Sequence, residues 1–173
     1  AIIAVGAYFR FDRIADAPPE MTSDHVEKIL DSARVLDGVT QVFFPNNGGR
    51  EPIQMYLMAM LSQVPGLGMN FNTLKLLTAL EGIVTLPLLF LFGREIIGRK
   101  DRQLGNIVGL CLAGLVAVSA WHEILSRMGL RIVLTVTVTT LLLTYLSRGL
   151  RNNQRGDFIK AGLVLGIGLY AYQ

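Results

Sequence analysis

The chain has 173 residues, 51% of them hydrophobic, and a mean hydropathy of +0.46. A soluble domain of this length rarely has so apolar a composition, so we expect an integral membrane protein. The formal net charge is +3, an excess that in membrane proteins marks cytoplasmic loops rather than a nucleic-acid surface. The single cysteine, Cys111, excludes an intrachain disulfide and a thiolate metal cluster.

The chain begins with the apolar residues 1–9. They are too few to span a bilayer, which takes about 20 residues, and they predict the end of a first transmembrane helix. Tyr8, Phe9 and then Arg10 are expected at the membrane surface. Because the last residues, 161–173, also form an interrupted apolar run, we expect the chain to be part of a longer membrane protein.

A polar segment with two predicted helices follows. The first helix, 23–37, has an apolar stripe along one side, and either Ser23 or Asp24 can serve as its N-cap. The second helix, 53–64, is apolar but short, which favours a re-entrant or interfacial position. The turn-rich segment 46–52 between them is expected to fold back over the start of the first helix.

Longer apolar runs make up the rest of the chain. Residues 133–140 alternate apolar residues with threonine, which resembles a strand, but an open strand edge cannot lie in lipid. We therefore predict a helix there, with threonine hydroxyls returned to the backbone. The predicted spans are 71–93, 104–121 and 131–147, with a partial span at 161–173. The sequence thus predicts an all-α, polytopic membrane protein.

Positive charges predict which side each loop faces. Arginines and lysines cluster in the loops 94–102 and 148–160, and the positive-inside rule puts both in the cytoplasm. The long loop 10–70 and the short loop 122–131 then lie outside, provided that residues 53–64 do not cross. Asp24 is therefore expected on the external side.

Four short motifs have a shared pattern: Asp24 at the head of an amphipathic helix, the Asn-Asn-Gly-Gly-Arg-Glu-Pro segment 46–52, the basic segment 93–99 and the loop 122–131. Together they resemble the polytopic GT-C glycosyltransferases, a superfamily that includes protein O-mannosyltransferases and aminoarabinose transferases. The resemblance covers nearly the whole chain, but only the N-terminal portion of such an enzyme, and is nearest to a family 39-like bacterial branch. It implies a multi-pass protein of the bacterial inner membrane, with the Asp24 loop on the periplasmic side.

The resemblance also implies an activity and a set of site residues. The activity is transfer of a sugar, with inversion, from a polyprenyl-phosphate donor to an acceptor, with membrane lipid as the other partner and no nucleic acid. An external-loop aspartate acts as the base in that superfamily, and Asp24 occupies the matching position. The residues that the resemblance implies for substrate binding are Asn47, Arg50, Glu51, His122, Arg127 and Arg131.

The chain departs from the family pattern at two positions. His25 follows Asp24 where many members have a glutamate, and Glu51 stands where some carry a lysine. In the family that lysine would contact the carrier phosphate, so we expect an arginine to take this role here, because the arginine side chain can hold two phosphate oxygens at once. The candidates are Arg50, Arg127 and Arg131.

Simpler structural alternatives accompany these roles. Asp24 is also a good N-cap, and arginines at helix ends can snorkel to the interface. His25 with Asp24 and Glu27 leaves a divalent metal open as a cofactor, whereas Ser126 replaces the second histidine that a zincin motif beginning at His122 requires. The altered motif positions also fit an alternative function, a non-catalytic membrane subunit of a larger complex that retains the scaffold.

Two features concern the interior of the predicted membrane part. Glu81 is a carboxylate near the middle of a predicted span, and such residues are functional candidates by default. Lys75, about a turn and a half earlier, is its nearest candidate partner. Gly162, Gly166 and Gly168 predict close contact between helices.

Overall fold

The structure is a computed structural model, and it describes residues 1–46, 49–98 and 101–172. Within these residues the chain forms eight helices and no strand, so the predicted all-α fold class is confirmed. The helices are α1 (Ile2–Phe11), α2 (Ser23–Leu36), α3 (Ile53–Ser62), α4 (Phe71–Ile97), α5 (Arg102–Ala117), α6 (Ala120–Arg127), α7 (Ile132–Asn152) and α8 (Arg155–Gly168).

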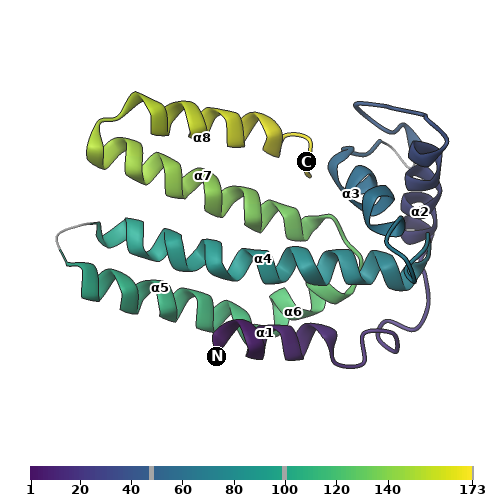
Figure 1. Cartoon of the computed structure of the whole chain (residues 1–173), viewed down its shortest axis with the longest axis horizontal. Coiled ribbons are helices and arrows are strands. Elements are labelled where there is room, and N and C mark those ends of the chain that lie inside the picture. Colours follow the sequence, from purple (N-terminus) through teal and green to yellow (C-terminus); the bar gives the residue numbers. More distant parts are fainter. Residues whose placement is uncertain (47–48, 99–100, 173) are drawn as a thin grey trace.

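Helix α4 is the central element of the molecule. It packs between α5 and α7, and α8 continues the layer beyond α7 (Figure 1). The 27 residues of α4 extend for about 40 Å. Helices α2 and α3 gather where α4 begins, whereas the α4–α5 and α7–α8 connections lie at the opposite end. The two ends of the bundle therefore differ in structure, since α2 and α3 lie at one of them and helix connections at the other.

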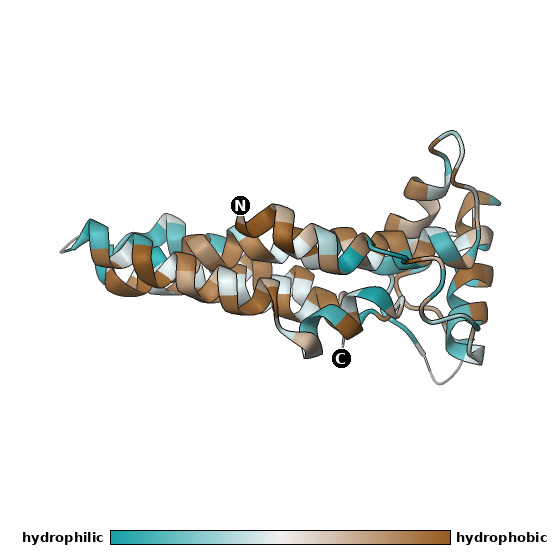
Figure 2. Cartoon of the chain, turned by 90° about the horizontal axis from the view of Figure 1, so that it is seen from below, coloured by the Kyte–Doolittle hydropathy of each residue, from teal (hydrophilic) through white to brown (hydrophobic). Residues whose placement is uncertain are grey.

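Two helices, α4 and α7, are long and apolar enough to cross a membrane. Helices α5 and α6 make a third candidate span only when they are counted together, because the chain bends by 57° between them. Apolar residues cover much of the bundle in Figure 2, and hydrophilic residues gather at the tip where α4 meets α5. The sequence predicts one span over 104–121 and a loop over 122–131, but α5 ends at Ala117 and α6 covers much of that loop.

The bend between α5 and α6 is held by Arg10 of α1. Although the sequence predicts Arg10 at the membrane surface, its side chain is 0% exposed. Its guanidinium donates to the carbonyls of Ala117 at 3.1 Å and Val116 at 3.2 Å, where α5 ends. It also contacts His122 Nδ1 at 2.8 Å. Arg10 thus supplies donors to backbone groups at the end of α5.

Close helix contact occurs mainly at glycines that the sequence analysis does not select. A Cβ at Gly93 of α4 would lie only 2.5 Å from the Cα of Gly109 in α5, so neither position has room for a side chain. The prediction of close contact is confirmed for Gly168, which faces α7, but it is wrong for Gly162 and Gly166. A Cβ at either of those positions would meet nothing within 4 Å.

The threonine-rich run is helical, as predicted, and forms the first part of α7. The hydroxyl of Thr140 donates to the carbonyl of Val136 at 2.7 Å, and Thr144 donates to the carbonyl of Thr140 at 2.7 Å. Because each hydroxyl has a hydrogen-bond partner, it can lie in an apolar environment without the free-energy cost of an unpaired polar group.

The predicted pairing of Lys75 with Glu81 is wrong. The Lys75 ammonium donates to the carbonyls of Ala15 at 3.0 Å and Pro18 at 3.2 Å, and so ties the α1–α2 connection to α4. Glu81 is buried and accepts from the side-chain amide of Gln54 in α3 at 3.4 Å. Glu81 therefore joins α3 to α4 instead of compensating a charge on its own helix.

Candidate functional site

Helix α2 begins with a capping box formed by Thr22 and His25. The backbone N–H of Thr22 donates to His25 Nδ1 at 3.0 Å. The sequence predicts Ser23 or Asp24 as the cap, which is wrong, since Ser23 is the first helical residue and Asp24 lies in the first turn. Because Asp24 is not the cap, its carboxylate is available for contacts with other parts of the chain.

The Asp24 carboxylate lies between two cations. Its oxygens are 2.6 Å from the Lys28 ammonium and 2.7 Å from the Arg50 guanidinium. Arg50 also donates to the Asp24 carbonyl at 2.9 Å and to the Glu27 carboxylate at 3.0 Å. The prediction that segment 46–52 folds back onto the start of α2 is therefore confirmed through Arg50, whose side chain is 1% exposed.

These cations set the protonation of Asp24. Partial burial raises the pKa of the carboxyl, but the hydrogen bond from Lys28 and the charges of Lys28, Arg50 and Arg131 outweigh burial and hold the pKa below its usual range. Asp24 is consequently ionised at neutral pH. Its side chain is 34% exposed, so the carboxylate still faces an accessible space.

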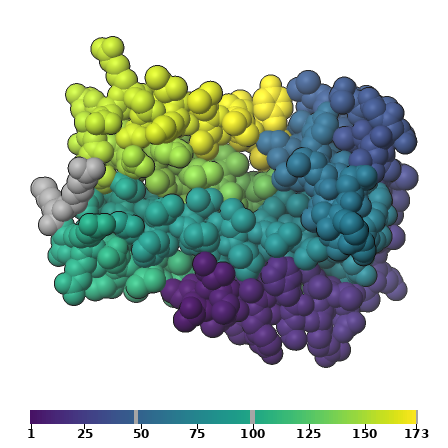
Figure 3. All heavy atoms as spheres, in the orientation of Figure 1, coloured from purple at the N-terminus to yellow at the C-terminus, as the bar shows by residue number. Residues whose placement is uncertain are grey.

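Asp24 opens onto a cavity of about 200 Å³. The lining residues are Asp24, Lys28, Leu125, Leu130, Arg131, Ile132 and Tyr172. Arg131 is ion-paired with Glu51 and lies 5.4 Å from the centre of the Tyr172 ring. The C-terminal residues pack beside the α2–α3 region in Figure 3, and the N–H of Ile53 donates to the carbonyl of Tyr170 at 3.3 Å.

Two of the predicted site residues lie elsewhere. Arg127 donates to the carbonyl of Phe9 at 2.7 Å, near the end of α1. His122 is buried against Arg10, and neither residue lines the Asp24 cavity. Asn47 falls outside the residues that the structure describes. Of the phosphate-binding candidates, Arg131 lines the cavity, whereas Arg50 contacts Asp24 and Glu27.

The ring of His25 does not join a metal site. Its Nε2–H donates to the carbonyl of Met128 at 2.6 Å, while Nδ1 accepts from Thr22. Glu27 is directed to Arg50, so the metal-binding set suggested by His25, Asp24 and Glu27 is not assembled. Across residues 1–46, 49–98 and 101–172, no group of three or more His, Cys, Asp or Glu side chains is placed to hold a metal ion.

Helix α2 turns a polar face toward the protein. Its buried residues are His25, Lys28, Asp31 and Ser32. Three members of its apolar stripe, Val26, Leu30 and Leu36, are instead 40%, 54% and 45% exposed. Sequence reasoning missed Lys28, although its position four residues after Asp24 is a spacing that places opposite charges together on a helix.

The neutral state of His25 leads to a prediction about pH. Burial lowers the pKa of His25 below its usual value near 6.5, and the hydrogen bond to Met128 only partly opposes this. The unfolded chain therefore takes up a proton below about pH 6.5 that the folded chain resists, and stability falls as the pH drops further. We expect the unfolding midpoint of the wild type in detergent to fall more steeply from pH 7 to pH 5 than that of His25→Gln. Parallel curves would contradict this.

Comparison with protein-family models, with curated proteins and with solved structures found no match for this chain. The geometry described above therefore carries the functional argument.

Proposed function

We propose that the chain is the membrane-embedded N-terminal portion of a GT-C-type glycosyltransferase. It would move a sugar, with inversion, from a polyprenyl-phosphate donor to an acceptor at the external face of a bacterial inner membrane. The observation that carries the proposal is that a carboxylate and a cation, Asp24 and Arg131, line one cavity at the end of an apolar helix bundle.

The reaction needs these two groups in fixed positions. Asp24 would take the proton of the acceptor hydroxyl, whose oxygen attacks the anomeric carbon as the bond from that carbon to the phosphate oxygen breaks. The departing polyprenyl phosphate carries away the bonding electrons, and Arg131 would hold its charge with support from Lys28. Phosphate is already a good leaving group, so positioning and charge stabilisation provide most of the catalysis.

The contacts of Arg131 define how a donor would bind. Arg131 is ion-paired with Glu51, so a donor phosphate has to compete with that carboxylate for the guanidinium. When a donor binds, the Glu51 carboxylate would either move toward the acceptor or stay beside the phosphate on the Arg131 guanidinium. Before a donor binds, the ion pair with Glu51 would keep the Arg131 side chain ordered.

The exposed apolar stripe of α2 supports a position at a membrane surface. Val26 and Leu30 are exposed on α2, and α2 lies at the same end of the bundle as the Asp24 cavity. An amphipathic helix lying in the interface buries such a stripe in lipid. In this arrangement the cavity stands where a lipid-linked sugar could reach it.

The proposed orientation predicts a labelling pattern. A cysteine at Ser23 should react with an impermeant thiol reagent added outside intact cells, whereas a cysteine at Arg155 should react only after the membrane is opened. Both substitutions are made in a background without Cys111, which is exposed. Equal labelling of the two positions from outside would contradict the orientation.

Sugar transfer by the full-length protein tests the proposed activity. With a polyprenyl-phosphate-linked sugar as donor, Arg131→Gln should lower kcat/KM by about ten- to a hundredfold, because one charged fork to the phosphate is lost. Arg13→Gln is the matched control. Arg13 is 78% exposed and pairs with Asp16, which is 59% exposed, so its loss should have little effect. Equal losses in both variants would remove Arg131 from the site.

A second candidate function is a non-catalytic membrane subunit that retains this scaffold. The two ion pairs of Asp24 favour it, because a carboxylate held by Lys28 and Arg50 can serve structure alone. A full-length protein that transfers no sugar from any polyprenyl-phosphate donor, yet copurifies with other membrane proteins, would support this candidate.

A further inference from the structure

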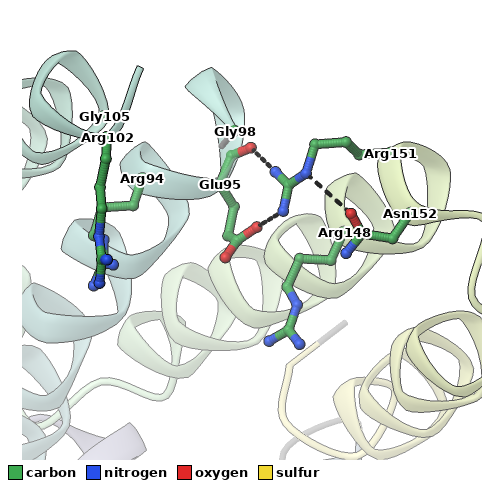
Figure 4. Close-up of a pocket in the computed structure, with 8 residues that line it drawn as sticks. All are labelled: Arg94, Glu95, Gly98, Arg102, Gly105, Arg148, Arg151 and Asn152. Carbon is green, nitrogen blue, oxygen red and sulfur yellow. Dashed lines mark hydrogen bonds and ion pairs between the residues drawn. The ribbon is translucent and has the colours of Figure 1, made fainter. Parts of the chain in front are cut away.

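A second cavity, of about 570 Å³, is lined by residues near the end of α4, the start of α5 and the end of α7, at the end of the bundle opposite to α2 (Figure 1). Figure 4 shows its lining residues. Sites for small molecules commonly enclose roughly 300–1,000 Å³. The lining residues are Arg94, Glu95, Gly98, Arg102, Gly105, Arg148, Arg151 and Asn152. In the described part of the chain, four arginines therefore face a single carboxylate in this cavity, which we call the arginine cavity.

One of the four arginines neutralises that carboxylate. Arg151 of α7 is ion-paired with Glu95 of α4 and also donates to the Glu95 carbonyl at 2.6 Å. Gly98 permits this approach, since its φ is +75° and a Cβ there would lie 3.0 Å from the Arg151 side chain. Arg151 thus ties the ends of α4 and α7 together and leaves the charge of the other three arginines in excess.

The other three guanidinium groups are weakly compensated. Over residues 1–46, 49–98 and 101–172, no carboxylate lies within 4.0 Å of Arg94 or Arg102. Arg148 lies 3.7 Å from Asp157, which Lys160 also approaches at 4.0 Å. In Figure 4 no hydrogen bond or ion pair joins any of the three to Glu95 or Arg151, and in this view Glu95 lies between Arg148 on one side and Arg94 and Arg102 on the other. Like charges that converge on one concave site raise its affinity for an anion.

A small apolar crevice of about 90 Å³ adjoins the arginine cavity and shares Glu95 and Arg148 with it. The rest of its lining comes from α4 and α7. These residues are Leu88, Leu91, Leu141, Thr144 and Tyr145. An anion bound at the arginines would thus have a leucine-lined surface beside it, which suits an acyl chain and offers nothing to a small soluble phosphate.

We propose that the arginine cavity binds the phosphate headgroup of an anionic membrane lipid, with Arg94, Arg102 and Arg148 around the phosphate. An acyl chain of the same lipid lies along the crevice between α4 and α7. Arginine suits this ligand because its fork matches phosphate oxygens in pairs, and basic pockets between membrane helices are typical headgroup sites. The inference needs membrane insertion, part of the proposed function, but it does not need transferase activity.

Lipid retention by the purified full-length protein tests the proposal. The protein in a non-ionic detergent is titrated with phosphatidylglycerol or phosphatidylcholine, and bound lipid is counted by native mass spectrometry. We expect phosphatidylglycerol to bind at least about tenfold more tightly. Arg94→Gln and Arg102→Gln should each weaken it by about tenfold, the loss expected for one charge-assisted contact. Unfolding midpoints in detergent identify any variant that fails to fold, and Arg94→Lys, which keeps the charge without the fork, should be intermediate.

Arg155→Gln is the matched control, because Arg155 is exposed at the same end of the bundle but does not line the cavity. It should bind phosphatidylglycerol like the wild type. If Arg155→Gln weakens binding as much as Arg94→Gln and Arg102→Gln do, the proposal is overturned in favour of diffuse electrostatic attraction.

Inorganic phosphate at millimolar concentration should not displace the lipid. Displacement would identify a soluble phosphate ligand instead, and equal binding of both lipids would show that the arginines select no anion. Leu91→Asn should weaken the binding of phosphatidylglycerol, because a polar side chain would then line the crevice. A wild-type affinity of the Leu91→Asn variant for phosphatidylglycerol would show that the acyl chain does not lie in the crevice.

Discussion

Replacing Asp24 with asparagine is expected to lower the rate of sugar transfer by about a hundred- to ten-thousandfold, the usual loss when a general base is removed. The asparagine amide matches the shape of the carboxylate, but it cannot take up the proton of the hydroxyl group that attacks the sugar. The helix start should survive, because the capping box belongs to Thr22 and His25. The measurement is single-turnover transfer by the full-length protein, with circular dichroism and detergent stability as checks on folding.

The substitution also removes the ion pairs of Asp24 with Lys28 and Arg50, so a control must separate charge balance from catalysis. Glu27→Gln serves this purpose, since Glu27 pairs with the same Arg50 at 3.0 Å, is 33% exposed and does not line the cavity. We expect it to transfer sugar at close to the wild-type rate. Equal losses in both variants would reduce Asp24 to a structural partner of Arg50, and wild-type transfer by Asp24→Asn would favour the non-catalytic subunit.

The helical character of the chain and seven of its eight described helices could be predicted from the sequence, because apolar runs bounded by charges fix where a chain can cross lipid. Helix α6 was predicted as a loop. The break between α5 and α6 could not be predicted. It depends on Arg10, which lies more than 100 residues away in the chain and donates to the carbonyls at the end of α5. A local pattern contains no information about such a partner.

The sequence also could not predict which face of α2 turns toward the protein. Its apolar stripe predicted an amphipathic helix, and α2 is one, but the usual reading assumes that water lies outside the protein. Here His25 and Lys28 face inward and donate to the carbonyls of Met128 and Gly129. The polar face is therefore the one that binds the α6–α7 connection. Of the stripe, Val26, Leu30 and Leu36 stay exposed, whereas Ile29 packs against the apolar core of α3 and α4.

The candidate site was only partly predictable for a similar reason. The prediction that segment 46–52 folds back over the start of α2, made because Pro52 begins a new helix, is confirmed by the contact of Arg50 with Asp24. Arg127 and Arg131 are four residues apart and would share a face of one continuous helix. Gly129 interrupts the helix with a φ of +69°, so Arg127 reaches α1 while Arg131 enters the cavity. Only the three-dimensional path of this connection separates the two roles.

Arg10→Met is expected to destabilise the protein by about 3 kcal/mol or more, which is the largest effect on stability that we predict. Methionine fills much of the same volume but donates no hydrogen bond, so the carbonyl of Ala117 loses the donor that Arg10 supplies at 3.1 Å. Hydrogen bonds from a charged donor contribute about 1.5–3 kcal/mol each, and a buried acceptor left without a partner costs about 1–3 kcal/mol. The measurement is the denaturation midpoint of the purified protein in mixed detergent micelles.

The opposing effect is the cost of burying a guanidinium. No carboxylate in the described ranges forms an ion pair with Arg10, and replacement of buried charges by apolar side chains can be neutral or stabilising. We expect the loss of hydrogen bonds to outweigh this gain, because the bend between α5 and α6 leaves backbone carbonyls that methionine cannot satisfy.

The stability of Arg10→Lys should lie between those of the wild type and Arg10→Met, since one ammonium cannot contact Ala117, Val116 and His122 together. Arg13→Gln, at an exposed ion pair, should change stability by less than about 1 kcal/mol. A methionine variant as stable as that control would show that the bend holds without Arg10.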